Sequence, residues 1–381
     1  MANQPLAYFD DLRERNVLEI KKLKDQGKKV VGTYCAFTPK ELIIAAGAIP
    51  VSLCGTRQEP IPEAEKILPR NLCPLIKSSF GFAITGSCPY FYFADLLIAE
   101  TTCDGKIKMY ELLREYKPMH ILNLPPTSLG EDAFAYWYNE ILKAKERLER
   151  EFAVEITTAK LQEAIRLVNE ERRALLEFHR LNRHDPAPLS GLDLLKVLWA
   201  KGFTPDIAAG TAVIRQVTLA VKEQMARGVS AAPPGSPRIL LTGCPVGLGS
   251  EKVIKLVEAG GGVVVCLESC SGIKALEPLV DEEGDPLQAI AAKYLQVPCP
   301  CLTPNRGRLE LLERLIKEYR VDGVIDLIWQ ACHTYNIESY SIKKLVQEKA
   351  GLPFLPIETD YSTSDLQQLK VRIDAFLEMI K

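Results

Sequence analysis

Short runs of β-branched and other apolar residues alternate with helical patterns at both ends of the sequence. The runs cover Lys29–Tyr34, Ile49–Leu53, Asp95–Glu100, Met119–Leu124, Ile239–Gly243, Val263–Val265, Gly323–Trp329 and Phe354–Ile357. Nearly continuous apolar strands separated by helices are typical of a parallel sheet covered by helices on both faces. The sequence therefore predicts an α/β fold with two flavodoxin-like or Rossmann-like domains.

A different pattern separates the two ends. From about Glu131 to Arg227 the chain reads as long charged helices with apolar residues three and four positions apart, and Gly228–Pro237 has the composition of a linker. We expect an N-terminal α/β domain over residues 1–130, a helical connector over 131–235 and a C-terminal α/β domain over 236–381.

The chain contains eleven cysteines. The N-terminus has no apolar core of signal-peptide length, so we expect a cytoplasmic protein, where disulfides do not persist. An odd number of cysteines in a reducing compartment favours metal or redox chemistry over a disulfide framework.

Most cysteines follow a predicted strand. Cys35, Cys54 and Cys244 come directly after one, Cys103 and Cys332 each follow the end of one by three residues, and Cys270 follows Val263–Val265 by a few residues. Ligands of open parallel sheets collect at the carboxyl ends of the strands. A single cysteine of this kind is more often a small buried apolar residue, but several at strand ends together indicate a site.

Zinc is the first alternative for such a set. The sequence has no Cys-x-x-Cys pair, and its close pairs are Cys266/Cys270 and Cys299/Cys301. Structural zinc usually uses local knuckles, whereas thiolates scattered over two domains suit an iron–sulfur cluster between them.

Other partners and motifs are not indicated. Forty-seven basic and forty-nine acidic residues give a net charge of −2, with no basic stripe for nucleic acid, and the longest uncharged stretch is too short and polar for a membrane anchor. No phosphate-binding Gly-x-x-x-x-Gly-Lys-Ser/Thr motif is present. His333 adjoins Cys332 and is a candidate proton donor, although a hydrogen bond from it to a cluster sulfur is an equally good interpretation.

Five segments carry a family resemblance. They are Thr33–Leu42, Leu68–Ser78, Glu100–Lys106, Gln330–Tyr335 and Ile357–Tyr361. With these motifs in order, the sequence resembles the 2-hydroxyacyl-CoA dehydratase D-component family and, within it, the double-cubane cluster proteins. The resemblance spans nearly the whole chain.

The resemblance implies cubane clusters held by three cysteines each. Cys73, Cys103 and Cys332 match the commoner set, which holds a 4Fe-4S cluster. An 8Fe-9S double cubane needs three more thiolates, and Cys35, Cys54 and Cys270 are the candidates because of their position near strand ends. Cys88, Cys244 and Cys301 remain open as replacements for any of these six.

The resemblance also implies function. Double-cubane proteins are homodimers that reduce small molecules with electrons from an actin-like-fold ATPase carrying its own 4Fe-4S cluster. The extra cysteines favour this anaerobic oxidoreductase chemistry. The alternatives are a hydro-lyase subunit acting on (R)-2-hydroxyacyl-CoA with one 4Fe-4S cluster, and a non-catalytic iron–sulfur electron carrier.

Overall fold

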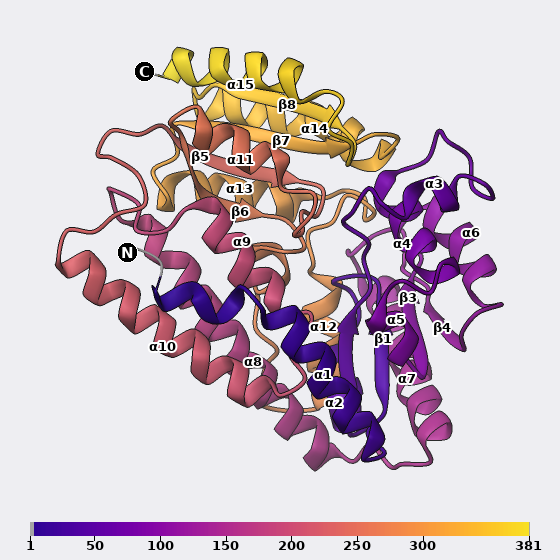
Figure 1. Cartoon of the computed structure of the whole chain (residues 1–381). Coiled ribbons are helices and arrows are strands. Elements are labelled where there is room, and N and C mark those ends of the chain that lie inside the picture. The colour runs from indigo at the N-terminus through magenta and orange to yellow at the C-terminus, as the bar shows by residue number, and fades with distance from the viewer. Residues whose placement is uncertain (1–3, 381) are drawn as a thin grey trace.

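Two parallel four-stranded sheets organise the molecule (Figure 1). The computed structural model describes residues 4–380. Sheet A has the order β2-β1-β3-β4 and sheet B the order β6-β5-β7-β8, so the two sheets share one strand order. The predicted α/β class with two Rossmann-like domains is confirmed. No helix within residues 4–380 is both long and apolar enough to cross a membrane.

Sheet A lies in the N-terminal third of the chain. Its strands are β1 (Val30–Thr33), β2 (Ile49–Ser52), β3 (Leu96–Glu100) and β4 (Met119–Leu122). The segments around them form η1 (Gln4–Phe9), α1 (Leu12–Asp25), α2 (Lys40–Ala45), α3 (Ile61–Ala64), α4 (Pro74–Ile84), α5 (Pro89–Phe93) and α6 (Asp104–Leu113). β1 and β3 are buried along their full lengths, because helices cover both faces of the sheet.

Helices fill the middle of the sequence. They are α7 (Glu131–Phe152), α8 (Thr158–Arg180), η2 (Leu181–Arg183), α9 (Gly191–Ala200) and α10 (Ile207–Ala226). Side chains of Thr157, Ser190 and Asp206 accept backbone N–H groups at the starts of α8, α9 and α10, which explains where these helices begin. α9 packs directly on β6 of sheet B.

Sheet B repeats the first architecture. Its strands are β5 (Arg238–Gly243), β6 (Val263–Glu268), β7 (Gly323–Trp329) and β8 (Phe354–Thr359). The accompanying helices are α11 (Lys252–Ala259), η3 (Ile273–Ala275), α12 (Pro286–Leu295), α13 (Arg306–Glu318), α14 (His333–Lys344), η4 (Leu345–Lys349) and α15 (Leu366–Ile380). β6 extends three residues beyond the predicted Val263–Val265, so that Cys266 lies inside the strand.

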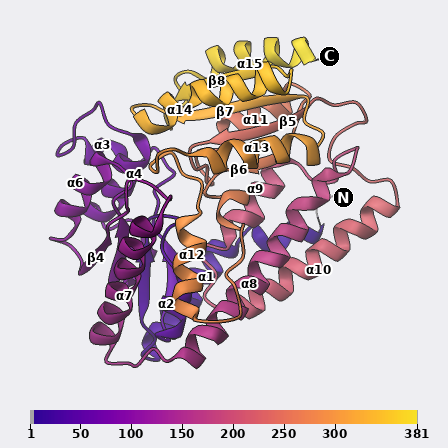
Figure 2. The ribbon, with the colours of Figure 1, turned by 180° about the vertical axis from the view of Figure 1, so that it is seen from behind.

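The hydrophobic core joins the two domains. One cluster of buried residues contains Val51 and Leu97 of sheet A, Leu195 of α9 and Leu241 and Leu327 of sheet B. α12 follows β6 in sequence yet packs beside α7 and α8, and its apolar residues belong to the cluster under sheet A (Figure 2). The carboxyl ends of both sheets are therefore held in one packed body.

Candidate functional site

Equivalent strands of the two sheets carry cysteines at equivalent places. Cys35 and Cys244 follow the first strands, β1 and β5, while Cys54 and Cys270 follow the second, β2 and β6. Cys103 and Cys332 follow the third, β3 and β7, and each stands immediately before a helix, α6 or α14. In both sheets the strand order reverses between the first and third strands, which is where open α/β sheets bind ligands.

One group of thiols gathers around Cys332. The thiols of Cys244 and Cys73 donate hydrogen bonds to the Cys332 sulfur, and these lower the pKa of Cys332 far below the usual range of a thiol. Cys73 stands immediately before α4 of the N-terminal domain, so the group contains thiols from both domains. Cys103 lies close enough for a thiolate at Cys332 to raise its pKa, although burial is the larger cause.

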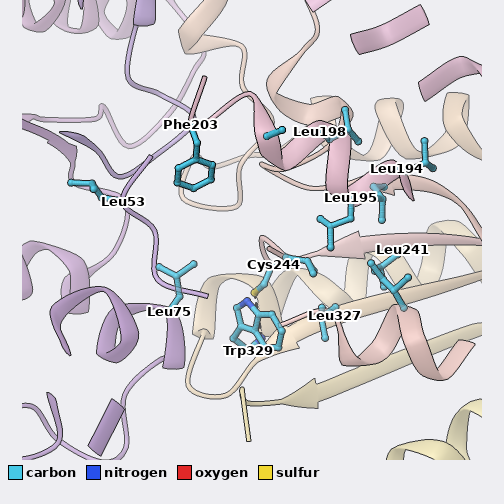
Figure 3. Packing of buried hydrophobic residues seen from close by; sticks show 14 of the residues in the cluster. Leu53, Leu75, Leu194, Leu195, Leu198, Phe203, Leu241, Cys244, Leu327 and Trp329 are labelled. Atoms are coloured by element: carbon cyan, nitrogen blue, oxygen red, sulfur yellow. Dashed lines mark hydrogen bonds between the residues drawn. The ribbon is translucent and has the colours of Figure 1, made fainter. Parts of the chain in front are cut away.

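Apolar side chains surround this group. In Figure 3, Leu53 and Leu75 of the N-terminal domain lie on one side of Cys244, and Leu241 and Leu327 of sheet B lie on the other. The Trp329 backbone N–H donates to the Cys244 sulfur at 3.3 Å. Such a shell excludes water and favours soft thiolate ligation.

A second group of thiols lies around Cys35 and Cys270. Burial raises the pKa of Cys35, and thiolates at Cys270 and Cys299 raise it further. Burial also raises the pKa of Cys270 to about 11, with Cys299 and Cys54 among its charged neighbours. Cys301 donates a hydrogen bond to Cys299, which lowers the pKa of Cys299 to about 6.

Part of the second group lines a cavity of about 160 Å³, with Cys35, Cys54 and Cys270 in its wall. The buried Lys106 lines it too and donates from Nζ to the Tyr34 carbonyl at 3.0 Å. Burial alone would lower the pKa of Lys106, but Tyr110 and the neighbouring thiols raise it above its ordinary value. A permanent ammonium charge therefore stands beside the thiols.

Glu100 ends β3 behind this cavity. Burial raises the pKa of its carboxyl group to about 7, while the Thr38 hydroxyl donates a hydrogen bond to Oε1. Its Oε2 atom is buried and has no hydrogen-bond partner within residues 4–380.

Charged residues of α2 and of the helical region also line the cavity. Lys40 of α2 pairs with Glu171 of α8 at 3.6 Å, and Arg172 pairs with the buried Glu41 at 2.7 Å. Lys201 follows the last residue of α9, and its Nζ atom is buried without a hydrogen-bond partner among the described residues. The helices that join the two domains in sequence thus form part of the site.

The structure separates the remaining sequence candidates. Cys88 stands before α5 and accepts a hydrogen bond from the Phe91 N–H at 3.5 Å, with Arg13 as its charged neighbour. Cys266 is buried in a different apolar cluster of the C-terminal domain. His333 is the first residue of α14, and its side chain is exposed.

The residues that sequence reasoning missed are charged ones. Lys40, Glu171 and Lys201 read as ordinary solvated positions of helices, and no motif marks them. One further residue, Cys299, stands out in the sequence only as half of a close pair, and its place in the second thiol group depends on the path of the chain after α12.

The donor set suits a cluster better than a single ion. Within residues 4–380, no three His, Cys, Asp or Glu side chains converge as ligands of one metal ion. Each group instead supplies at least three thiols, some buried and some half-buried, without a histidine or carboxylate ligand among them. Soft thiolate ligands of this kind are those that iron–sulfur clusters use.

Comparison with known proteins gives a consistent picture. The family model "2-hydroxyglutaryl-CoA dehydratase, D-component" matches residues 35–380. The chain is 48% identical to the putative dehydratase subunit YjiM of Escherichia coli K12, covering 98% of this chain and 97% of that protein. It is 24% identical to the (R)-phenyllactyl-CoA dehydratase beta subunit of Clostridium sporogenes (98% and 97% covered). It is also 20% identical to a benzoyl-CoA reductase subunit of Thauera aromatica (94% and 92% covered).

Proposed function

This chain belongs to the 2-hydroxyglutaryl-CoA dehydratase D-component family, and on that premise we propose that it is a low-potential reductase of small molecules. The reaction takes place at an iron–sulfur centre held by thiols of both α/β domains. The observation that carries the proposal is that thiols from distant parts of the chain gather in two groups, one around Cys332 and one around Cys35.

We assign the six ligands as the sequence predicts them. Cys73, Cys103 and Cys332 hold one cubane, with Cys244 as the alternative to any of them because it donates to the Cys332 sulfur. Cys35, Cys54 and Cys270 hold the second, with Cys301 as the alternative since it lies near Cys35 and Cys270. Two sets of three thiols support an 8Fe-9S double cubane over one 4Fe-4S cluster.

The bound cluster supplies single electrons at low potential and an iron atom open to substrate. The chain's own residues do the rest. Lys106 balances the negative charge of the thiolates at the cavity, and the apolar shell around Cys244 keeps water away. The cavity then admits a small molecule beside Cys35, Cys54 and Cys270.

The electrons come from a separate protein in this proposal. No phosphate-binding loop motif occurs in the sequence, so ATP is hydrolysed on a partner, an actin-like-fold ATPase with its own 4Fe-4S cluster. The reductase itself acts as a homodimer in the cytoplasm.

A second candidate is a dehydratase subunit that acts on a 2-hydroxyacyl-CoA. Its support is the 48% identity to a putative dehydratase subunit and the weaker identity to a phenyllactyl-CoA dehydratase beta subunit. It requires only one cubane and, in general, a second related subunit.

Iron and acid-labile sulfide, measured per chain after purification without oxygen, separate these functions. About eight irons support the double cubane and about four support the dehydratase centre. Zinc without iron would refute both. Reduction of acetylene or hydrazine with partner ATPase, ATP and Mg²⁺ then distinguishes a reductase from an electron carrier, which shows a reversible cluster and no turnover.

A further inference from the structure

The cavity beside the thiols has an excess of positive charge on its helical side. We propose that Lys201, assisted by Lys40, binds the anionic group of a small substrate in this cavity. This inference rests on the proposed function, because it assigns a substrate group to the same cavity. Both residues line the cavity with Cys35, Cys54 and Cys270.

Lys201 is the cation of this lining that lacks a partner among the described residues. Arg172 pairs with Glu41 at 2.7 Å and donates to the Tyr294 hydroxyl at 3.0 Å, and Lys40 pairs with Glu171 at 3.6 Å. The buried Nζ of Lys201 makes no hydrogen bond within residues 4–380. A buried ammonium without a partner is costly, and an anion at hydrogen-bond distance would offset that cost.

The neighbours of Lys201 point to a substrate rather than to the cluster. Lys106 is the cation beside the thiols, since Cys35, Cys54 and Cys103 all act on its charge. Lys40, which pairs with Glu171, donates from Nζ to the Lys201 carbonyl oxygen at 3.4 Å. Lys201 thus lies on the side of the cavity lined by Lys40 and Glu171.

The chemistry of these groups limits the ligand. Arg172 is already engaged by Glu41 and Lys40 by Glu171, so the free donor is the ammonium group of Lys201, which acts as a point charge and not as a planar fork. The cluster held by Cys35, Cys54 and Cys270 would fill part of the cavity of about 160 Å³, so the space left beside Lys201 holds only a compact anionic group. The substrate class is therefore a small monoanion, such as a monocarboxylate with a short carbon chain.

The test uses acetate and acetamide, which have the same size and differ in charge. Binding of each radiolabelled compound is measured by equilibrium dialysis on the full chain purified without oxygen, with iron determined on the same samples. We expect wild type to prefer acetate and Lys201→Met to bind it roughly 10-fold more weakly or worse, as loss of a hydrogen bond to a charged group implies. Acetamide binding should not change.

Three further variants make the result specific. Lys201→Arg should recover much of the acetate binding because it restores a cation. Lys196→Met removes a lysine of the same helix, α9, that pairs with Asp10 at the surface, and should bind acetate like wild type. Lys201→Met should melt no earlier than wild type, since it removes an unpaired buried charge, whereas a structural role for Lys201 would lower the melting temperature.

Equal binding of acetate and acetamide, or unchanged acetate binding in Lys201→Met, overturns this inference even if about eight irons are found. Acetate preference that depends on Lys201 in protein without iron supports the anion site and refutes the proposed reductase. If Lys201→Met does not fold, Lys201→Gln is dialysed in its place.

Discussion

The side chains around a cysteine decide what its sulfur can do. Cys332 stands at the N-terminal end of α14, where backbone N–H groups favour a negative charge, and Cys244 and Cys73 donate hydrogen bonds to it. Cys266 lies within β6, and burial raises the pKa of its thiol well above the usual range. The first is ready to bind metal as a thiolate and the second is not.

This contrast gives a matched pair of substitutions. Cys332→Ser should lose most of the iron, because a hydroxyl is a poor ligand in a sulfide cage. Cys103→Ser should do the same. Cys266→Ser removes a buried sulfur in the same domain as Cys332 and should keep the iron content and visible spectrum of wild type. Full iron content in both Cys332→Ser and Cys103→Ser would contradict the ligand assignment.

His333 is predicted to deliver protons rather than to hold the cluster. Its side chain is exposed at the start of α14, next to Cys332. His333→Ala should retain iron and slow substrate reduction roughly 100-fold or more, the contribution expected of a general acid. Loss of iron together with activity would show instead that His333 supports the cluster structurally.

His179 makes the stability of the fold dependent on pH. Leu267 N–H donates to its Nε2 at 3.2 Å, so Nδ1 carries the proton that faces the Tyr319 hydroxyl at 2.6 Å. Burial, with Arg183 and Arg180 nearby, lowers its pKa from 6.5 to about 3. Below pH 6.5 this histidine therefore takes up a proton in the unfolded chain but stays neutral in the folded chain. The free energy of unfolding consequently falls as the pH drops from 6.5 towards 3.

At pH 5 the neutral His179 should lower the free energy of unfolding by about 2 kcal/mol relative to its value at neutral pH. Urea unfolding of wild type and His179→Asn at pH 7 and pH 5 measures it, and the variant should show the smaller pH dependence. His184→Asn changes an exposed histidine and should behave like wild type. Equal pH dependence in all three proteins would remove His179 as the cause.

At the scale of elements, the strand ends depend on close backbone contacts. Gly243 ends β5 with φ of +114°, and a Cβ atom there would lie 2.1 Å from the Leu327 carbonyl oxygen of β7. The residue that follows is Cys244. The glycine thus lets β5 and β7 bring Cys244 and Cys332 together.

Gly243→Ala should destabilise the protein and reduce its iron content. Gly235→Ala is the control, because Gly235 also has a positive φ, +79°, but its Cβ would meet no atom within 4 Å. The control should cost only the roughly 1–2 kcal/mol of left-handed backbone, and Gly243→Ala should cost clearly more. Urea unfolding and iron analysis of both variants test this, and equal costs would show that the approach to Leu327 is unimportant.

Some elements and site residues can be predicted from the sequence, and others cannot. Strands such as Gly323–Trp329 could be predicted because a strand buried on both faces is apolar throughout, and a cysteine after it then falls at the ligand-binding edge. The burial of Lys201 could not be predicted, because a lysine at a helix end is usually solvated. Its Nζ atom is buried by packing between α8, α9 and sheet A. The position of α12 beside α7 likewise depends on contacts distant in sequence.

For the whole molecule, the absence of a recognisable nucleotide motif leads to a prediction about dependence on a partner. The purified chain should show no ATPase activity and no sustained reduction of acetylene or hydrazine. Both should appear only when the actin-like ATPase, ATP, Mg²⁺ and a strong reductant are added together. Steady turnover with dithionite alone, at the rate seen with partner and ATP, would contradict the proposed division of labour.

The two thiol groups each draw on both halves of the chain, Cys73 with Cys332 and Cys35 with Cys270. During synthesis the N-terminal cysteines leave the ribosome more than two hundred residues before Cys332 does. If these sulfurs hold a cluster, it can be inserted only after Cys332 has been synthesised and both halves have met. A truncated product that ends before β7 would leave the N-terminal thiols exposed to oxidation.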